Sequence, residues 1–330
     1  MNRPHIESST SVASLEAVFS SRAESIHDEL PKLCNAILRV LLYYDIWEYP
    51  LTLKELQTFL PLRGVSEAGI GSALAMEGSR IGVVEYGGYY SVRVNVRSVV
   101  DRRLARERHA QRMWKAARLS THIIKRFPFV RAVFISGDLS KNSTGLGSDI
   151  DFFVLTEPGR LWICRTLLIL FKKLFLLNSK KFFCVNFFAS IDNLTQQERN
   201  VYVAAEVAHL KAMYNEALFI KFMAANAWIR KFFPNFNQGK LPMRAPDNRE
   251  SHLQRIFERL LTSLPLDRID TLLMNKMEQV WAQRYPQHDP STRMKIFKCT
   301  KQESRAYGGD FHDKILTMYD RKLREFHIEE

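Results

Sequence analysis

Two aspartates, Asp149 and Asp151, stand one residue apart in the largely apolar segment Ser148–Leu155. Because side chains alternate between the two faces of a strand, both carboxylates would lie on one face while Ile150 and Phe152 face the other. Two carboxylates on a rigid strand supply the oxygen ligands that Mg²⁺ prefers. An apolar strand seldom carries two inward charges without a partner, so the pattern predicts a divalent metal site. A solvated strand face is the alternative interpretation.

A second feature lies just upstream, where an apolar run beginning at Ala132 ends at a serine and a glycine. Backbone N–H groups at a tight turn and at the start of a following helix can bind phosphate. A phosphate site beside a carboxylate pair suggests Mg²⁺, or Mn²⁺, acting on the phosphates of a nucleotide. The candidate phosphate-binding residues are Ser136, Gly137, Ser140, Lys141 and Ser148.

The spacing of these two features resembles the nucleotidyltransferase superfamily with the polymerase-beta-like fold. Its signature is an apolar strand ending in a glycine pair or Gly-Ser, about ten further residues, and then Asp-x-Asp between apolar residues. Gly137 matches the glycine, Asp149 and Asp151 match the metal-binding and catalytic pair, and Ser148 is also usual. The resemblance covers roughly residues 125–200 and implies transfer of a nucleoside monophosphate from a nucleoside triphosphate, with release of pyrophosphate. The acceptor is not identified.

Two positions depart from that signature. Asp138 stands where the family carries Ser or Gly, and we interpret it as the N-cap of the next helix. The later strand expected over Phe182–Phe188 offers Asn186 where the family has a third carboxylate. Asn186 is a candidate metal ligand, but an amide cannot act as a general base, so the alternative function is a catalytically decayed regulator that binds a nucleotide or nucleic acid. Three carboxylates would favour turnover if the fold brought one of them to the pair: Asp192, Glu198 and Glu206.

The region before this motif, residues 30–95, predicts three helices followed by a hairpin. Thr52 and Glu55 form a capping box, and Gly87-Gly88 separates two short strands. This order resembles a winged helix-turn-helix domain. The helix expected over residues 66–76 contains no Lys or Arg, which favours a packing or protein-binding role over DNA binding.

Positive charge gathers in residues 96–127, which we expect to form a long helix connecting two domains. A basic connector beside a phosphate site could guide a nucleic acid, and a solvated helix face is the alternative. The net charge of +13 also favours contact with a polyanion. The basic residues in and just before this segment are Arg93, Arg97, Arg102, Arg103, Arg106, Arg108, Arg112, Lys115, Arg118, Lys125 and Arg126.

The sequence beyond the motif predicts mostly helices. The Thr195 to Glu198 run reads as a capping box that opens a helix toward Met213. The expected fold class is a multidomain α/β (α+β) protein whose nucleotidyltransferase core has a mixed sheet. The expected parts are a flexible N-terminus (1–29), a winged-helix-like domain (30–95), a basic connecting helix (96–127), the core (128–200) and a C-terminal helical bundle (201–330).

No secretory signal is expected, because the first residues are polar and serine-rich. The longest apolar run, Leu161–Leu177, is interrupted by three charged residues and predicts a buried helix rather than a membrane span. The four cysteines are dispersed without paired metal spacing, which favours reduced thiols and a cytoplasmic location. The expected partners are a nucleoside triphosphate and, through the basic helix, a nucleic acid, with no membrane; the oligomeric state is not indicated.

Overall fold

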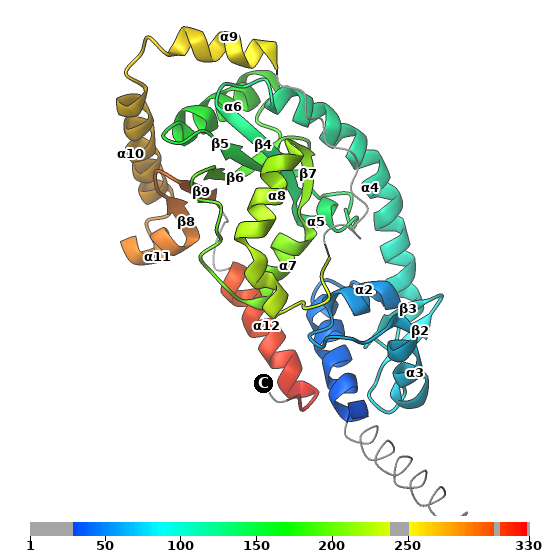
Figure 1. Ribbon diagram of the computed structural model, residues 1–330. Coiled ribbons are helices and arrows are strands. Elements are labelled where there is room, and N and C mark those ends of the chain that lie inside the picture. The colour runs from blue at the N-terminus through cyan, green and yellow to red at the C-terminus, as the bar shows by residue number, and fades with distance from the viewer. Residues whose placement is uncertain (1–28, 238–250, 307–310, 329–330) are drawn as a thin grey trace, which may run out of the picture. The chain divides into compact units, whose positions relative to one another are not determined.

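The computed structural model describes residues 29–237, 251–306 and 311–328, and its chain divides into two compact units (Figure 1). Unit 1 comprises the chain up to Val100 together with Tyr319–Glu330, and unit 2 comprises Asp101–Met318. The predicted flexible N-terminus, residues 1–29, lies almost entirely outside the described residues. The protein is of mixed α/β class, as expected.

Unit 1 combines short helices with a small antiparallel sheet of strand order β1-β3-β2. The predicted capping box is confirmed: the Thr52 hydroxyl accepts from the Glu55 N–H, and the Glu55 carboxylate accepts from the Thr52 N–H. The predicted hairpin is also present, with Gly87 and Gly88 at its turn. In chain order the elements are a helix over residues 29–45, β1 (Leu51–Thr52), α2 (Leu53–Phe59), α3 (Glu67–Glu77), β2 (Val84–Tyr86) and β3 (Tyr89–Ser91).

The end of the last helix, α12 (Phe311–Glu325), packs within unit 1 from Tyr319 onward. The Tyr319 hydroxyl donates to the carbonyl of Arg39, and Lys322 pairs with the buried carboxylate of Asp45 at 2.5 Å. This placement departs from the predicted C-terminal bundle, because the apolar and basic side chains of α12 find partners on the first helix. The predicted basic connecting helix is present as α4 (Val96–Ile124).

Unit 2 is built around a six-stranded mixed sheet of order β7-β4-β5-β6-β9-β8. The β4 and β5 strands are antiparallel, whereas β5 and β6 are parallel, with a helical crossover between them. The central strands are continuously apolar because helices cover both faces of the sheet. The strands are β4 (Val130–Ser136), β5 (Asp151–Thr156), β6 (Cys184–Ser190), β7 (Lys211–Tyr214), β8 (Phe297–Cys299) and β9 (Glu303–Ala306).

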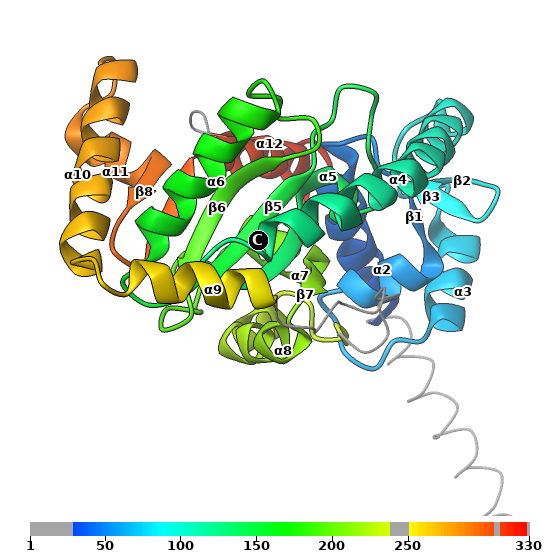
Figure 2. The same ribbon diagram turned by 90° about the horizontal axis from the view of Figure 1, so that it is seen from above.

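Helices pack on the two faces of this sheet, and Figure 2 shows α6 and α8 on opposite sides of β5. One face forms a core with α4, α6 and α10, in which Trp162 and Trp281 are buried. On the other face, Phe222 of α8 packs edge-on against Phe153 of β5. The helices are α5 (Gly137–Ser140), α6 (Leu161–Phe175), α7 (Val201–His209), α8 (Glu216–Ala225), the 3-10 helix η1 (Ala227–Lys231), α9 (His252–Leu261), α10 (Leu266–Arg284) and α11 (Pro290–Ile296).

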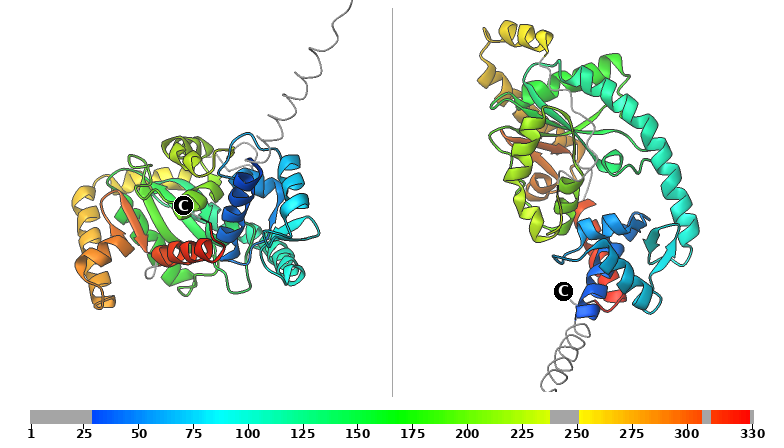
Figure 3. Two further views of the ribbon diagram at one scale, coloured as in Figure 1. Left: turned by 90° about the horizontal axis from the view of Figure 1, so that it is seen from below. Right: turned by 45° about the vertical axis from the view of Figure 1, so that its right-hand side comes forward.

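The region 201–330, predicted to be a helical bundle, also contributes three strands to the sheet. β7 pairs with β4 at one edge, while β8 and β9 extend the sheet beyond β6, beside α10 (Figure 3). The predicted capping box at Thr195 does not form, and α7 starts at Val201 with Asn200 as its N-cap. The physical reason is that the Glu198 carboxylate binds Arg305 of β9 at 2.6 Å instead of a local backbone N–H.

The long apolar run Leu161–Leu177 is buried only in its first half. Residues 161–165 and Leu168 are buried, whereas Leu174 is 64% exposed and Phe175 is 70% exposed. The prediction of a buried helix is therefore wrong for the second half of α6. Within the described part of the chain, no helix is both long and apolar enough to cross a membrane.

Candidate metal centre

The β4 and β5 strands place a glycine directly against one of the two aspartates. Ser136 is the cross-strand partner of Asp151, and Gly137 follows with φ at +63°, in the left-handed region that favours glycine. A Cβ atom at Gly137 would lie 2.4 Å from Oδ2 of Asp151. The turn therefore needs a residue without a side chain so that the backbone can approach the carboxylate.

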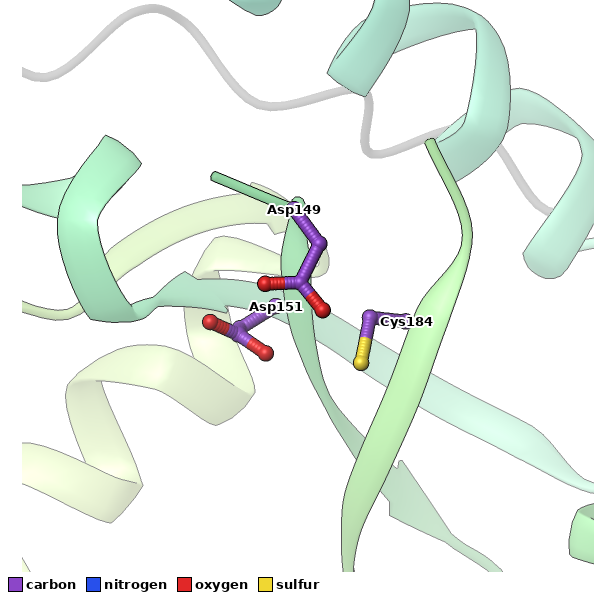
Figure 4. Close-up of side chains that lie close together, drawn as sticks. All are labelled: Asp149, Asp151 and Cys184. Carbon is purple, nitrogen blue, oxygen red and sulfur yellow. The ribbon is translucent and has the colours of Figure 1, made fainter. Parts of the chain in front are cut away.

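The two aspartates converge with a third side chain from the neighbouring strand (Figure 4). One ligand atom each from Asp149, Asp151 and Cys184 lies within 4.8 Å of the others. The pairing of β5 with β6 sets this arrangement, because Cys184 is the cross-strand partner of Asp151. In the part of the chain that the structure describes, this Asp-Asp-Cys group is the one group of three or more such residues close enough to share a metal ion.

Burial and neighbouring acidic groups shift the titration of two members of the group. Burial and the nearby Asp149 carboxylate raise the pKa of Asp151 to about 7, against opposing hydrogen bonds from Cys184 and Asn186. Burial and the two carboxylates also raise the pKa of the Cys184 thiol, which therefore stays protonated. A divalent cation placed between the carboxylates would stabilise their charged forms. The structure thus holds the Asp151 carboxylate where its charge costs free energy.

The predicted third ligand, Asn186, faces the pair as expected. Its Nδ2 donates to Oδ1 of Asp151 at 2.9 Å, so the amide fixes the orientation of that carboxylate. Its own Oδ1 is buried and accepts no hydrogen bond. An unused buried amide oxygen next to two carboxylates is a donor set that fits a divalent cation. The thiol of Cys184 adds a softer ligand, which Mn²⁺ or Zn²⁺ accepts more readily than Mg²⁺.

The side chains of the predicted phosphate-binding residues are engaged in hydrogen bonds or an ion pair within unit 2. The Ser140 hydroxyl donates to the Gly137 carbonyl at 2.7 Å, and the Ser148 hydroxyl donates to Asp138 at 2.7 Å. Lys141 pairs with Glu206 at 2.6 Å. The Ser136 hydroxyl reaches only the backbone carbonyl of Asp151, at 3.5 Å.

The interpretation of Asp138 as a helix N-cap is wrong. The α5 helix begins at Gly137 with Ser136 at its N-cap position, and Asp138 lies inside the first turn. Its carboxylate instead accepts from Ser148, which stands just before Asp149. This bond ties the two ends of the loop together. With four residues, α5 is too short for its N-terminus to hold a phosphate, so phosphate contact would depend chiefly on a bound cation.

None of the three carboxylates considered as a third acidic ligand joins the group. Glu206 pairs with Lys141, and Glu198 binds Arg305 together with His312. Asp192 accepts from the side chain of Gln302. The position opposite Asp151 is therefore filled by a thiol and an amide.

Sequence reasoning missed Cys184, which we grouped with the dispersed cysteines. The available signal was its place at the start of the strand that carries Asn186. If the two strands pair in parallel with their first residues in register, the first residue of the second strand lies beside the Asp151 carboxylate.

Comparisons of the chain with protein-family models, with curated proteins and with solved structures found no match.

Proposed function

We propose that unit 2 is a metal-dependent nucleotidyltransferase, which moves a nucleoside monophosphate from a nucleoside triphosphate to an acceptor. The observation that supports it most is the close approach of Gly137 to the Asp151 carboxylate, with Asp149 beside it. That arrangement agrees with the Gly…Asp-x-Asp motif by which the chain resembles the nucleotidyltransferase superfamily. The glycine and the acidic pair are brought together although eleven residues separate Gly137 from Asp149.

Each residue of the centre has a role in this proposal. Asp149 and Asp151 would bind Mg²⁺ or Mn²⁺. The hydrogen bond from Asn186 fixes the orientation of the Asp151 carboxylate. A bound divalent cation supplies positive charge that neutralises phosphate oxygens during transfer. Gly137 lets the backbone approach the Asp151 carboxylate, since a Cβ atom there would lie 2.4 Å from Oδ2. In the transfer, the acceptor oxygen bonds to the α-phosphorus and pyrophosphate leaves.

A second candidate function is nucleotide binding without transfer. The observation in its favour is that Asn186 and Cys184, rather than a carboxylate, stand opposite Asp151. Neither an amide nor a protonated thiol takes a proton from an acceptor hydroxyl at neutral pH. This candidate would make the protein a nucleotide-dependent regulator.

For unit 1, the resemblance to a winged helix-turn-helix domain is also a proposal. It is supported by the order of a helix over residues 29–45, α2, α3 and the β2–β3 hairpin. Because α3 contains no Lys or Arg, we propose that this unit contacts protein rather than DNA.

Turnover distinguishes the two candidate functions of unit 2. The purified protein is incubated with each of the four α-labelled nucleoside triphosphates, with Mg²⁺ or Mn²⁺, and with cellular RNA, protein and metabolites. We expect label to move to one acceptor class, and we expect Asp149→Asn/Asp151→Asn to abolish the transfer. The matched control is Asp192→Asn, which removes an exposed carboxylate outside the centre and should leave transfer unchanged.

Two other results are informative. Metal-dependent nucleotide binding without any transfer would favour the regulator. Transfer that persists in the double variant would exclude this centre as the site of the chemistry.

A further inference from the structure

A basic and apolar segment without acidic residues includes the end of α6 and leads toward β6. This Lys-Phe loop, residues 173–182, contains Lys173, Lys180 and Lys181 and has no Asp or Glu. All three lysines are exposed, and within the described chain none of them forms an ion pair. Three uncompensated charges in ten residues attract a polyanion. Apolar side chains stand exposed between them: Leu174, Phe175, Leu177 and Phe182.

Phe175 is a preformed aromatic platform on this loop. Its ring is 70% exposed, yet it stacks on Phe171 at a centroid distance of 5.0 Å. Phe171 in turn packs against Phe183, which packs against Phe152 of β5. The exposed ring is therefore supported from below by the core of unit 2. A rigid exposed aromatic ring is the kind of surface on which an unpaired base stacks.

The backbone at the tip of the loop is held in a strained form. Leu177 and Asn178 both have positive φ, at +47° and +59°. Leucine rarely adopts this conformation, and Leu177 is nevertheless 92% exposed. The Asn178 N–H donates to the carbonyl of Lys172 at 3.0 Å, which holds the turn closed. The exposed Leu177 side chain therefore stands at the tip of a turn whose backbone is fixed.

The Lys-Phe loop borders the metal centre directly. The N–H of Ile150, the residue between the two aspartates, donates to the carbonyl of Lys181 at 3.0 Å. Ser120 of α4 donates to the carbonyl of Phe182 at 2.7 Å, so the buried face of α4 contacts the same loop.

We propose that the Lys-Phe loop binds a single-stranded nucleic acid and presents it to the metal centre. Lysines neutralise backbone phosphates, and Phe175 stacks with a base, which an intact duplex does not offer. An anionic membrane would use the same lysines, but nothing in a lipid headgroup would require the neighbouring carboxylate pair. The assignment of the strand as the acceptor rests on the proposed transferase function, whereas binding of the strand does not.

The test is binding of the full chain to a fluorescein-labelled 20-nucleotide strand of mixed sequence, as RNA and as DNA, measured by anisotropy over a range of salt concentrations. We expect Lys173→Gln/Lys180→Gln/Lys181→Gln to lower the slope of log K against log salt by about 2, at about 0.7 per phosphate contact. We expect Phe175→Ala to weaken single-strand binding about ten-fold and duplex binding much less.

Matched controls remove the same number of lysine charges, or one phenylalanine ring, elsewhere on unit 2. Lys221→Gln/Lys276→Gln/Lys301→Gln removes three exposed lysines outside the loop, and Phe257→Ala removes an exposed ring of α9. Both control variants should bind the strand as the wild type does. Because Phe175 and the three loop lysines are exposed, their substitutions are not expected to prevent folding, and circular dichroism checks this.

The remaining outcomes separate this inference from the proposed function. Absence of strand binding, equal effects of loop and control variants, or loop-dependent binding to phosphatidylserine vesicles without strand binding would each overturn the inference. Label transfer to a protein or a metabolite, unaffected by the loop variants, would also overturn it while leaving the transferase in place. A further outcome is strand binding that depends on the loop and persists in Asp149→Asn/Asp151→Asn, with no label transfer by the wild type. That outcome would support the strand-binding site and contradict the proposed transferase function.

Discussion

Asp151→Asn should make the metal-free protein more stable at neutral and alkaline pH. The pKa of Asp151 is raised from 3.8 to about 7 by burial and by Asp149. A carboxyl group whose pKa is higher in the folded state favours folding at low pH, and stability is lost as pH rises from about 4 to about 7. Asn cannot ionise, and its side-chain oxygen still accepts from Asn186. The variant therefore does not lose the folding free energy that the wild type loses when Asp151 ionises.

The size of the effect follows from the shift in pKa. A difference of about 3 pKa units at about 1.4 kcal/mol each gives about 4 kcal/mol as the upper value above pH 7. For a unit of this size, 1 kcal/mol corresponds to about 2–4 °C in the unfolding midpoint. The midpoint of the variant should thus exceed that of the wild type by several degrees at pH 8 and by little at pH 4.

Thermal and urea unfolding in EDTA, at pH values from 4 to 8, measure this difference. Saturating Mn²⁺ should raise the stability of the wild type at pH 8 and leave Asp151→Asn nearly unchanged, because the variant lacks the charged ligand. The matched control Asp192→Asn should show neither effect. An Asp151→Asn variant that is equally or less stable than the wild type at pH 8 would refute the view that this carboxylate is held at a cost.

Three further predictions concern the same region. Gly137→Ala should destabilise unit 2 by about 1–3 kcal/mol in urea unfolding and weaken Mn²⁺ binding, because the new methyl group meets Asp151 at positive φ; an unchanged affinity for Mn²⁺ would contradict the close-approach argument. Cys184→Ser should lower the affinity for Zn²⁺ relative to Mg²⁺ in calorimetric titrations, because a hydroxyl is a harder ligand than a thiol; an unchanged ratio would place the thiol outside the coordination sphere. Leu177→Gly should stabilise the protein or leave it unchanged, by up to about 1 kcal/mol in urea unfolding, because glycine adopts the φ of +47° without strain; a clear loss of stability would show that the leucine side chain packs in the free protein.

The central features of the site could be predicted because they depend on neighbours in sequence. The period of two on a strand places Asp149 and Asp151 together, and a glycine before a tight turn is recognisable from the chain alone. Asn186 was expected to face the pair from the resemblance rather than from neighbouring residues, and its bond to Asp151 agrees. These inferences need only local geometry and a resemblance to a known motif.

The features that escaped prediction depend on partners far away in the chain. Cys184 joins the aspartates through the register of β5 with β6. The Glu198 carboxylate accepts a hydrogen bond from Arg305, a residue 107 positions later, instead of capping a local helix. Neither choice is visible from neighbouring residues, because each is decided by tertiary contacts that override local propensity.

The burial of α6 shows a third limit. Its sequence is apolar almost throughout, and hydropathy alone does not say which part of an apolar run meets a core. The core of unit 2 covers the first half, while in the second half Phe171 and Leu176 pack partly against it and Leu174 and Phe175 are exposed. Lys172 and Lys173, directly before those side chains, were the available sign that this end faces water.

The division of unit 1 between the two ends of the described chain has a consequence for synthesis. Its first helix supplies Asp45, but Lys322, one of the two cations that pair with that buried carboxylate, is made only after the whole of unit 2. Domains generally fold as units in the order in which they leave the ribosome. Unit 2 can therefore complete its sheet first. Unit 1, although most of it is synthesised earlier, cannot complete its packing until residues 319–328 have been synthesised.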